Sequence, residues 1–130
     1  PNVLQYPVVV AGILRAGCVV VNVNPMYTPR ELEHQLHDSG AEAIFILENF
    51  ATTLQSIQAR GHLKHVVVAS MGDLMGLVKG ALTNFVVRRV RKMVPAWSLP
   101  GHHRFGQMLS EGGRQAYKPV PLTPDDVAFL

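Results

Sequence analysis

The sequence predicts an α/β fold in which βαβ units build a parallel sheet. Three short segments, residues 18–24, 41–48 and 65–70, are almost continuously apolar and rich in Val, Ile and Ala. This composition is typical of strands that are buried on both faces of a parallel sheet. Stretches of helical length separate the segments, as the crossovers between parallel strands require. A chain of 130 residues is long enough for one modest core of this kind.

The first two predicted helices have recognisable limits. One covers residues 2–16 and places Pro7 in its first turn, where the missing N–H leaves no hydrogen bond unmade. The next begins with a capping box, in which the Thr28 hydroxyl accepts from the Glu31 N–H and the Glu31 carboxylate accepts from the Thr28 N–H. This helix runs to about residue 39, and Gly40 can close it in the left-handed conformation.

The later elements are shorter. A third helix is expected from about Phe50 to Arg60, with Leu54 and Ile57 inward and Gly61 as its stop. After Pro95 the chain is rich in Pro and Gly, which predicts an irregular connection with one short helix near 104–109. The final residues, 127–130, are expected to begin a further strand.

Residues 73–95 are the unusual part of the chain. No acidic residue occurs between Asp73 and Glu111, although that interval holds six cations. The apolar residues of its two halves form stripes rotated by roughly 100° on a continuous helix, so the helix should bend, break or be gripped on two sides. Four cations in it are candidate contacts to an anionic membrane surface: Arg88, Arg89, Arg91 and Lys92.

Two other interpretations of this segment compete with the membrane. It can be an ordinary helix that covers the sheet and exposes a solvated basic face. Nucleic acid binding is disfavoured, because no aromatic residue interleaves with the four cations to stack on bases. A transmembrane span is also not expected, since the chain has no run of 18 uncharged apolar residues.

Familiar catalytic and metal motifs are absent from the sequence. The interval from Gly12 to Gly17 has the glycine spacing of a phosphate loop but lacks the Lys and Ser/Thr that should follow. His34 and His37 are expected on the solvent face of their helix, and no metal ligand set accompanies them. Cys18 is the only cysteine, which excludes an internal disulfide, favours a reducing compartment and predicts a small buried residue in the first strand.

Polar residues follow the first predicted strand, at the end where open α/β sheets place ligands. They are Asn22, Asn24 and Tyr27. The more ordinary interpretation is that the asparagines satisfy backbone groups of the loop and that the tyrosine packs the turn.

Residues 16–46, AGCVVVNVNPMYTPRELEHQLHDSGAEAIFI, resemble the N-terminal domain of the adenylate-forming acyl-CoA synthetases. The stretch 77–101, LVKGALTNFVVRRVRKMVPAWSLPG, is similar to the bacterial long-chain fatty acid–CoA ligases within that superfamily. Residues 121–130, PLTPDDVAFL, resemble the lead-in to their phosphate-binding loop. The resemblance covers essentially the whole chain and implies an interior fragment of the N-terminal AMP-binding domain.

The resemblance also implies an activity and a division of the chain. A fatty acid and ATP would form an acyl-adenylate and pyrophosphate, after which the CoA thiol would displace AMP, with Mg²⁺ as cofactor. The implied division of residues 1–130 is a βαβ core at 2–72, a basic amphipathic helical segment at 73–95, an irregular connection at 96–124 and the start of the strand before the phosphate loop at 125–130.

No catalytic, cofactor-binding or metal-binding residue of the family is carried over, because its motifs would begin after Leu130. The 130-residue chain alone is therefore expected to be inactive. The expected location is the cytoplasm, with peripheral contact to the inner face of the cell membrane, and a homodimer is included among the expected partners. The alternative hypothesis is a free-standing α/β module that binds a membrane or a protein partner.

Overall fold

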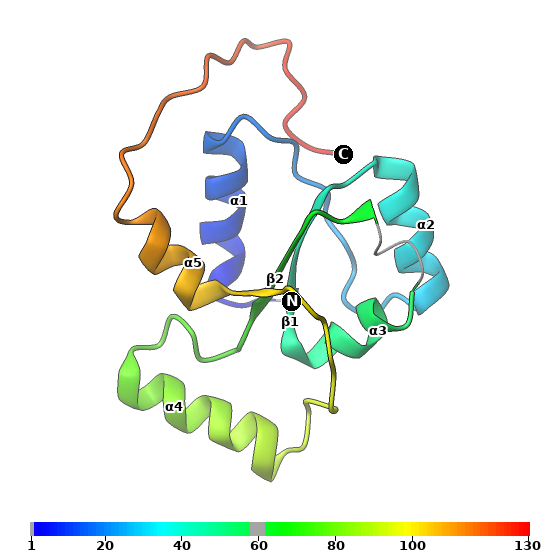
Figure 1. Cartoon of the computed structure of the whole chain (residues 1–130), viewed down its shortest axis with the longest axis vertical. Helices are drawn as coiled ribbons and strands as arrows, with labels where there is room; N and C mark the ends of the chain where they lie inside the picture. The colour runs from blue at the N-terminus through cyan, green and yellow to red at the C-terminus, as the bar shows by residue number, and fades with distance from the viewer. Residues whose placement is uncertain (1, 58–61) are drawn as a thin grey trace.

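The computed structural model describes residues 2–57 and 62–130, and its centre is a parallel sheet (Figure 1). The strand order is β1 (Ala43–Leu47), β2 (His65–Ala69) and β3 (His103–Arg104). β1 and β2 are paired along their whole length, with Ala43 opposite His65 and Leu47 opposite Ala69. β3 adds two residue pairs on the other side of β2. The predicted α/β class with a parallel sheet is confirmed.

Each face of the sheet has its own apolar core, because alternate side chains of a strand point to opposite faces. One core joins Ile44 and Val68 to α2 (Pro29–Ser39) and α3 (Ala51–Gln55). The other joins Leu47, Val67 and Ala69 to α1 (Gln5–Arg15) and α5 (Phe105–Gly112). Figure 1 shows α1 and α5 on one side of the strands and α2 and α3 on the other. This two-sided covering explains why β1 and β2 carry so few polar residues.

The predicted capping box of α2 is present. The Glu31 carboxylate accepts from the Thr28 N–H at 2.7 Å, and the Glu31 N–H donates to the Thr28 hydroxyl at 3.4 Å. The hydroxyl and then the backbone N–H of Thr28 lower the pKa of the Glu31 carboxyl, because both donate hydrogen bonds to its ionised form. Gly40 ends the helix with a φ of 61°, in the left-handed region that favours glycine.

The third helix agrees with its prediction over the part that is described. A 3-10 turn, Glu48–Phe50, leads directly into α3. Leu54 and Ile57 are buried, as expected. The predicted end at Arg60 and Gly61 lies outside the described residues.

The prediction that residues 18–24 form a strand of the sheet is wrong. Only Val20 makes a bridge, parallel to Phe129, with its N–H donating to the Ala128 carbonyl at 2.9 Å. A strand needs a backbone partner along its edge, and among the described residues the only bridge to this segment is the one from Phe129. Cys18 is exposed for the same reason, so its predicted burial is also wrong.

Residues 77–90 form one helical element with two kinds of winding. α4 (Leu77–Phe85) continues into a π-helical turn, η3 (Val86–Val90), without a break. Lys92 then takes a φ of 50°, and the Met93 N–H closes the end on the Val87 carbonyl at 3.0 Å. The helix was expected to bend, break or be gripped on two sides, and the structure shows a change from α-helical to π-helical winding at Val86. Figure 1 shows α4 beyond the ends of the strands, apart from the other helices.

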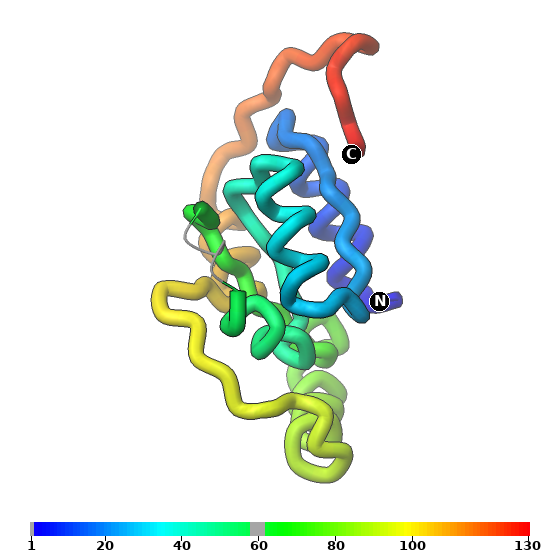
Figure 2. The backbone as a smooth tube through the Cα atoms, turned by 90° about the vertical axis from the view of Figure 1, so that its right-hand side faces the viewer, coloured from blue at the N-terminus to red at the C-terminus, as the bar shows by residue number. Residues whose placement is uncertain are grey.

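The C-terminal connection returns along the molecule to the segment before α2 (Figure 2). The short helix expected near 104–109 is present as α5, whereas β3, which precedes it, has no counterpart in the prediction. The Tyr117 hydroxyl donates to the Arg15 carbonyl at 3.1 Å, and the Arg15 guanidinium lies 4.3 Å from the centre of the tyrosine ring. These contacts hold the connection against the end of α1.

Candidate functional site

The carboxyl ends of β1 and β2 meet at one edge of the sheet, the place where open α/β sheets bind ligands. Glu48 follows β1 and is 4% exposed. The Arg88 guanidinium reaches it from η3, with Nε 3.0 Å from each carboxylate oxygen and Nη2 2.9 Å from Oε2. Nη2 also donates to the Ser70 hydroxyl, directly after β2, at 2.8 Å. The carboxylate at this edge is therefore neutralised by an internal partner.

Three residues at a spacing of four bring the helix to this edge. Gly80, Asn84 and Arg88 share one side of α4 and η3, as that spacing requires. Gly80 lies directly against Gly72, and a methyl group on it would overlap the Gly72 carbonyl oxygen. The Asn84 side-chain oxygen accepts from the Gly72 N–H at 2.9 Å. The close helix contact therefore needs glycine at position 80.

The opposite side of the helix is open. Arg89, Arg91 and Lys92 are exposed, whereas the guanidinium of Arg88, the fourth predicted membrane contact, points to the sheet. Large apolar side chains are exposed along the same segment, from 94% for Leu77 to 50% for Met93. Members of this exposed apolar row are Leu77, Val78, Leu82, Phe85, Val90 and Met93.

α1 is tied to the same edge by a buried glutamine, which the sequence analysis did not single out. Gln5 is 3% exposed, and its side-chain amide donates to the Ser70 carbonyl at 2.7 Å. A polar residue on the inward side of a helix rich in valine is the signal that could have indicated it. Glu48 carried a comparable signal, because it is an acidic residue that closes an apolar strand.

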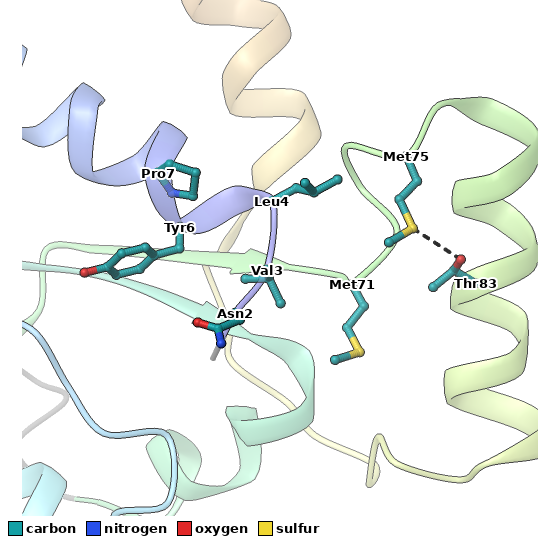
Figure 3. A pocket seen from close by; sticks show the side chains of 8 residues that line it. All are labelled: Asn2, Val3, Leu4, Tyr6, Pro7, Met71, Met75 and Thr83. Carbon is teal, nitrogen blue, oxygen red and sulfur yellow. Dashed lines mark hydrogen bonds between the residues drawn. The ribbon is translucent and has the colours of Figure 1, made fainter.

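An apolar hollow of about 570 Å³ lies between the start of α1 and the turn after β2 (Figure 3). Its lining residues are Asn2, Val3, Leu4, Tyr6, Pro7, Met71, Met75 and Thr83. The Thr83 hydroxyl is 3.4 Å from the Met75 sulfur. None of these eight side chains carries a formal charge, so the hollow offers no cationic partner for a phosphate or a carboxylate.

The polar residues before α2 have structural roles. The Asn24 side chain accepts from the Met26 N–H at 3.0 Å, and the Asn22 side chain accepts from the Tyr6 hydroxyl at 3.0 Å. Tyr27 packs against the core beside α2 and α3. The ordinary interpretation of these residues is therefore supported.

No group of three or more His, Cys, Asp or Glu side chains is placed to hold a metal ion anywhere in residues 2–57 and 62–130. His34 and His37 are both exposed, as predicted. Across the same ranges, no helix combines the length and apolar character needed to cross a membrane. The edge of the sheet thus contains a neutralised ion pair and a docked helix.

Comparison with known proteins decides the family. The profile of the AMP-binding enzymes matches residues 1–130. The chain belongs to the AMP-binding enzyme family. This match confirms the resemblance of residues 16–46 and 121–130 to adenylate-forming enzymes.

Curated relatives of this AMP-binding chain carry one recurring name. A long-chain-fatty-acid–CoA ligase of Escherichia coli O157:H7 is 52% identical over 130 residues, which are all of this chain and 23% of that protein. The ligase of the same name from Yersinia pestis is 49% identical over the same length. The one from Bacillus subtilis is 30% identical over 82 residues, or 63% of this chain. The chain thus spans about a quarter of the length of the Escherichia coli and Yersinia pestis ligases, and no solved structure gives a significant match.

Proposed function

We propose that the chain forms part of an ATP-dependent long-chain fatty acid–CoA ligase. The observation that carries this proposal is identity of about half over the whole chain with bacterial proteins of that name. The stretch 77–101, which is similar to those ligases in particular, lies within this alignment. The substrates in this proposal are a long-chain fatty acid, ATP and CoA.

The proposed reaction has two balanced steps. The fatty acid carboxylate attacks the α-phosphorus of ATP and releases pyrophosphate, which leaves an acyl-adenylate. The CoA thiol then attacks the acyl carbon, loses its proton and releases AMP, so that acyl-CoA is formed. Adenylation supplies the leaving group that a free carboxylate lacks.

This chain contributes scaffold to that reaction. Its described residues form strands of a parallel sheet, and Val20 pairs in parallel with Phe129 next to the point where the resemblance implies a phosphate loop. We assign no catalytic residue to it. The described residues also do not fit Mg²⁺, because no ligand cluster is present and the buried Glu48 carboxylate is already paired with Arg88.

The activity is tested with the protein encoded by the complete gene and, separately, with the 130-residue chain. We expect the complete protein to form acyl-CoA from a long-chain fatty acid, ATP and CoA, and to release pyrophosphate in equal amount. The 130-residue chain should form none. A complete protein that binds these substrates without forming acyl-CoA would leave the binding-module alternative in place.

A specific observation also favours contact with a membrane. Arg89, Arg91 and Lys92 are all exposed, in a segment that has no acidic neighbour in sequence. Each basic residue near an anionic bilayer contributes roughly 1 kcal/mol. We propose that the enzyme lies in the cytoplasm and makes peripheral contact with the inner face of the cell membrane. A second copy of the enzyme is a further candidate partner, and light scattering of the complete protein decides it.

A further inference from the structure

The basic segment has two sides with different chemistry, and this division is the basis of the inference. The inward side is fixed to the sheet through Gly80, Asn84 and Arg88. The outward side carries the greater part of the exposed apolar row defined above. Val78, Leu82 and Phe85 lie within one α-helix at spacings of four and three, so they share a single stripe.

Charge identifies what could cover this stripe. Arg89 follows Phe85 by four residues and extends the same side of the helix, and Arg91 and Lys92 are exposed at its end. An apolar stripe with cations at its margin is complementary to an anionic bilayer, where acyl chains receive the stripe and headgroup phosphates receive the cations. A neutral protein groove would account for the stripe alone and not for the three cations beside it.

We propose that α4 and η3 form a membrane-inserting element that lies flat in the interface of an anionic bilayer. The exposed apolar row enters the acyl-chain boundary by roughly 5–10 Å, as interfacial helices do. Arg89, Arg91 and Lys92 bind lipid phosphates. Arg88 contacts no lipid and acts as a positioning residue, because its ion pair with Glu48 holds the helix at the edge of the sheet. This inference deepens the membrane contact proposed above and rests on it.

The division predicts two separable parts of membrane binding. Contact through cations alone is screened by salt, since the Debye length falls to about 3 Å at 1 M. Contact through inserted apolar side chains is not screened. Binding of the complete protein to vesicles that contain phosphatidylglycerol should therefore fall on adding about 1 M salt but not reach zero.

The experiment compares two variants with two matched controls by vesicle sedimentation at low and high salt. Val78→Gln with Leu82→Gln removes two exposed apolar side chains of the stripe, and its control changes two others, Met26→Gln with Leu122→Gln. Arg89→Gln, Arg91→Gln and Lys92→Gln together remove the cations. The control for that triple changes cations exposed elsewhere, and it is Arg30→Gln, Arg114→Gln and Lys118→Gln.

We expect the apolar double variant to lose the salt-resistant binding and to bind about tenfold more weakly at low salt. The cation triple variant should lose the salt-sensitive part, and both controls should bind as the unchanged protein does. Unchanged vesicle binding by the apolar variant would overturn the insertion, and a lowered melting temperature in that case would identify the row as a contact inside the enzyme. If the unchanged complete protein binds vesicles but forms no acyl-CoA, that result counts against the proposed ligase and not against the insertion.

Discussion

Replacing Arg88 with methionine should destabilise the fold measurably, because the change leaves the Glu48 carboxylate without its charged partner. Removing one member of a fully buried ion pair costs about 3–5 kcal/mol. The Glu48 side chain is 5% exposed, but the Arg88 side chain is 45% exposed, so water already screens half of this pair. We therefore expect a loss of about 2 kcal/mol in the free energy of unfolding.

Urea unfolding followed by the fluorescence of Trp97, the single tryptophan, measures this loss. Glu48→Gln and the double variant complete a mutant cycle, and their coupling energy should be about 1–2 kcal/mol. Arg89→Met is the matched control and should change stability by less than about 0.5 kcal/mol, because its side chain lies on the exposed side. Equal effects of Arg88→Met and Arg89→Met, or a coupling energy near zero, would refute the role of the pair.

Further predictions concern the cap, a close contact and the core. Thr28→Ala should cost about 1 kcal/mol at neutral pH. The pKa of Glu31 in the folded protein lies below its ordinary value of 4.5. The charge-dependent part of the cap's stabilisation is therefore complete above pH 4.5 and is lost as the pH falls through the folded pKa. The difference in urea unfolding between wild type and Thr28→Ala should accordingly shrink in acid. Gly80→Ala should destabilise the fold by about 1–3 kcal/mol, because the added methyl group overlaps the neighbouring backbone. Gly12→Ala has open space around it and should stabilise the fold by up to about 1 kcal/mol. Shifts of the melting temperature in opposite directions for the two variants are the test. Leu54→Ala should cost about 2–5 kcal/mol in urea unfolding because the side chain is fully buried, and a loss below about 1 kcal/mol would contradict the described core.

Local rules in the sequence were sufficient for several elements of the fold. The Thr28 capping box and the closing Gly40 fixed the limits of α2, because both act through backbone groups within a few residues. The apolar content of β1 and β2 was enough to predict a sheet covered on both faces, since strands buried twice have no polar side.

The same local rules could not predict the elements whose structure depends on partners distant in the sequence. Residues 18–24 have the composition of a strand, but pairing is decided by which backbone lies alongside, and only the last residues do so. β3 has two residue pairs, too few for a periodicity to develop. The charge pattern correctly marked the basic segment, but it could not separate Arg88 from Arg89, because the difference arises from Glu48, which is 40 residues earlier in the chain.

The claim that α4 and η3 divide their side chains between sheet and lipid is tested most directly by a fluorescent label at single positions. In a background that has serine at Cys18 and at every other native cysteine, the label is attached to cysteine introduced at Leu82 or at Met26, and quenching by spin-labelled lipid is measured on anionic vesicles. The account predicts strong quenching at position 82, which persists in high salt, and none at position 26. Equal quenching at the two positions, or none at position 82 while the protein is bound, would contradict it.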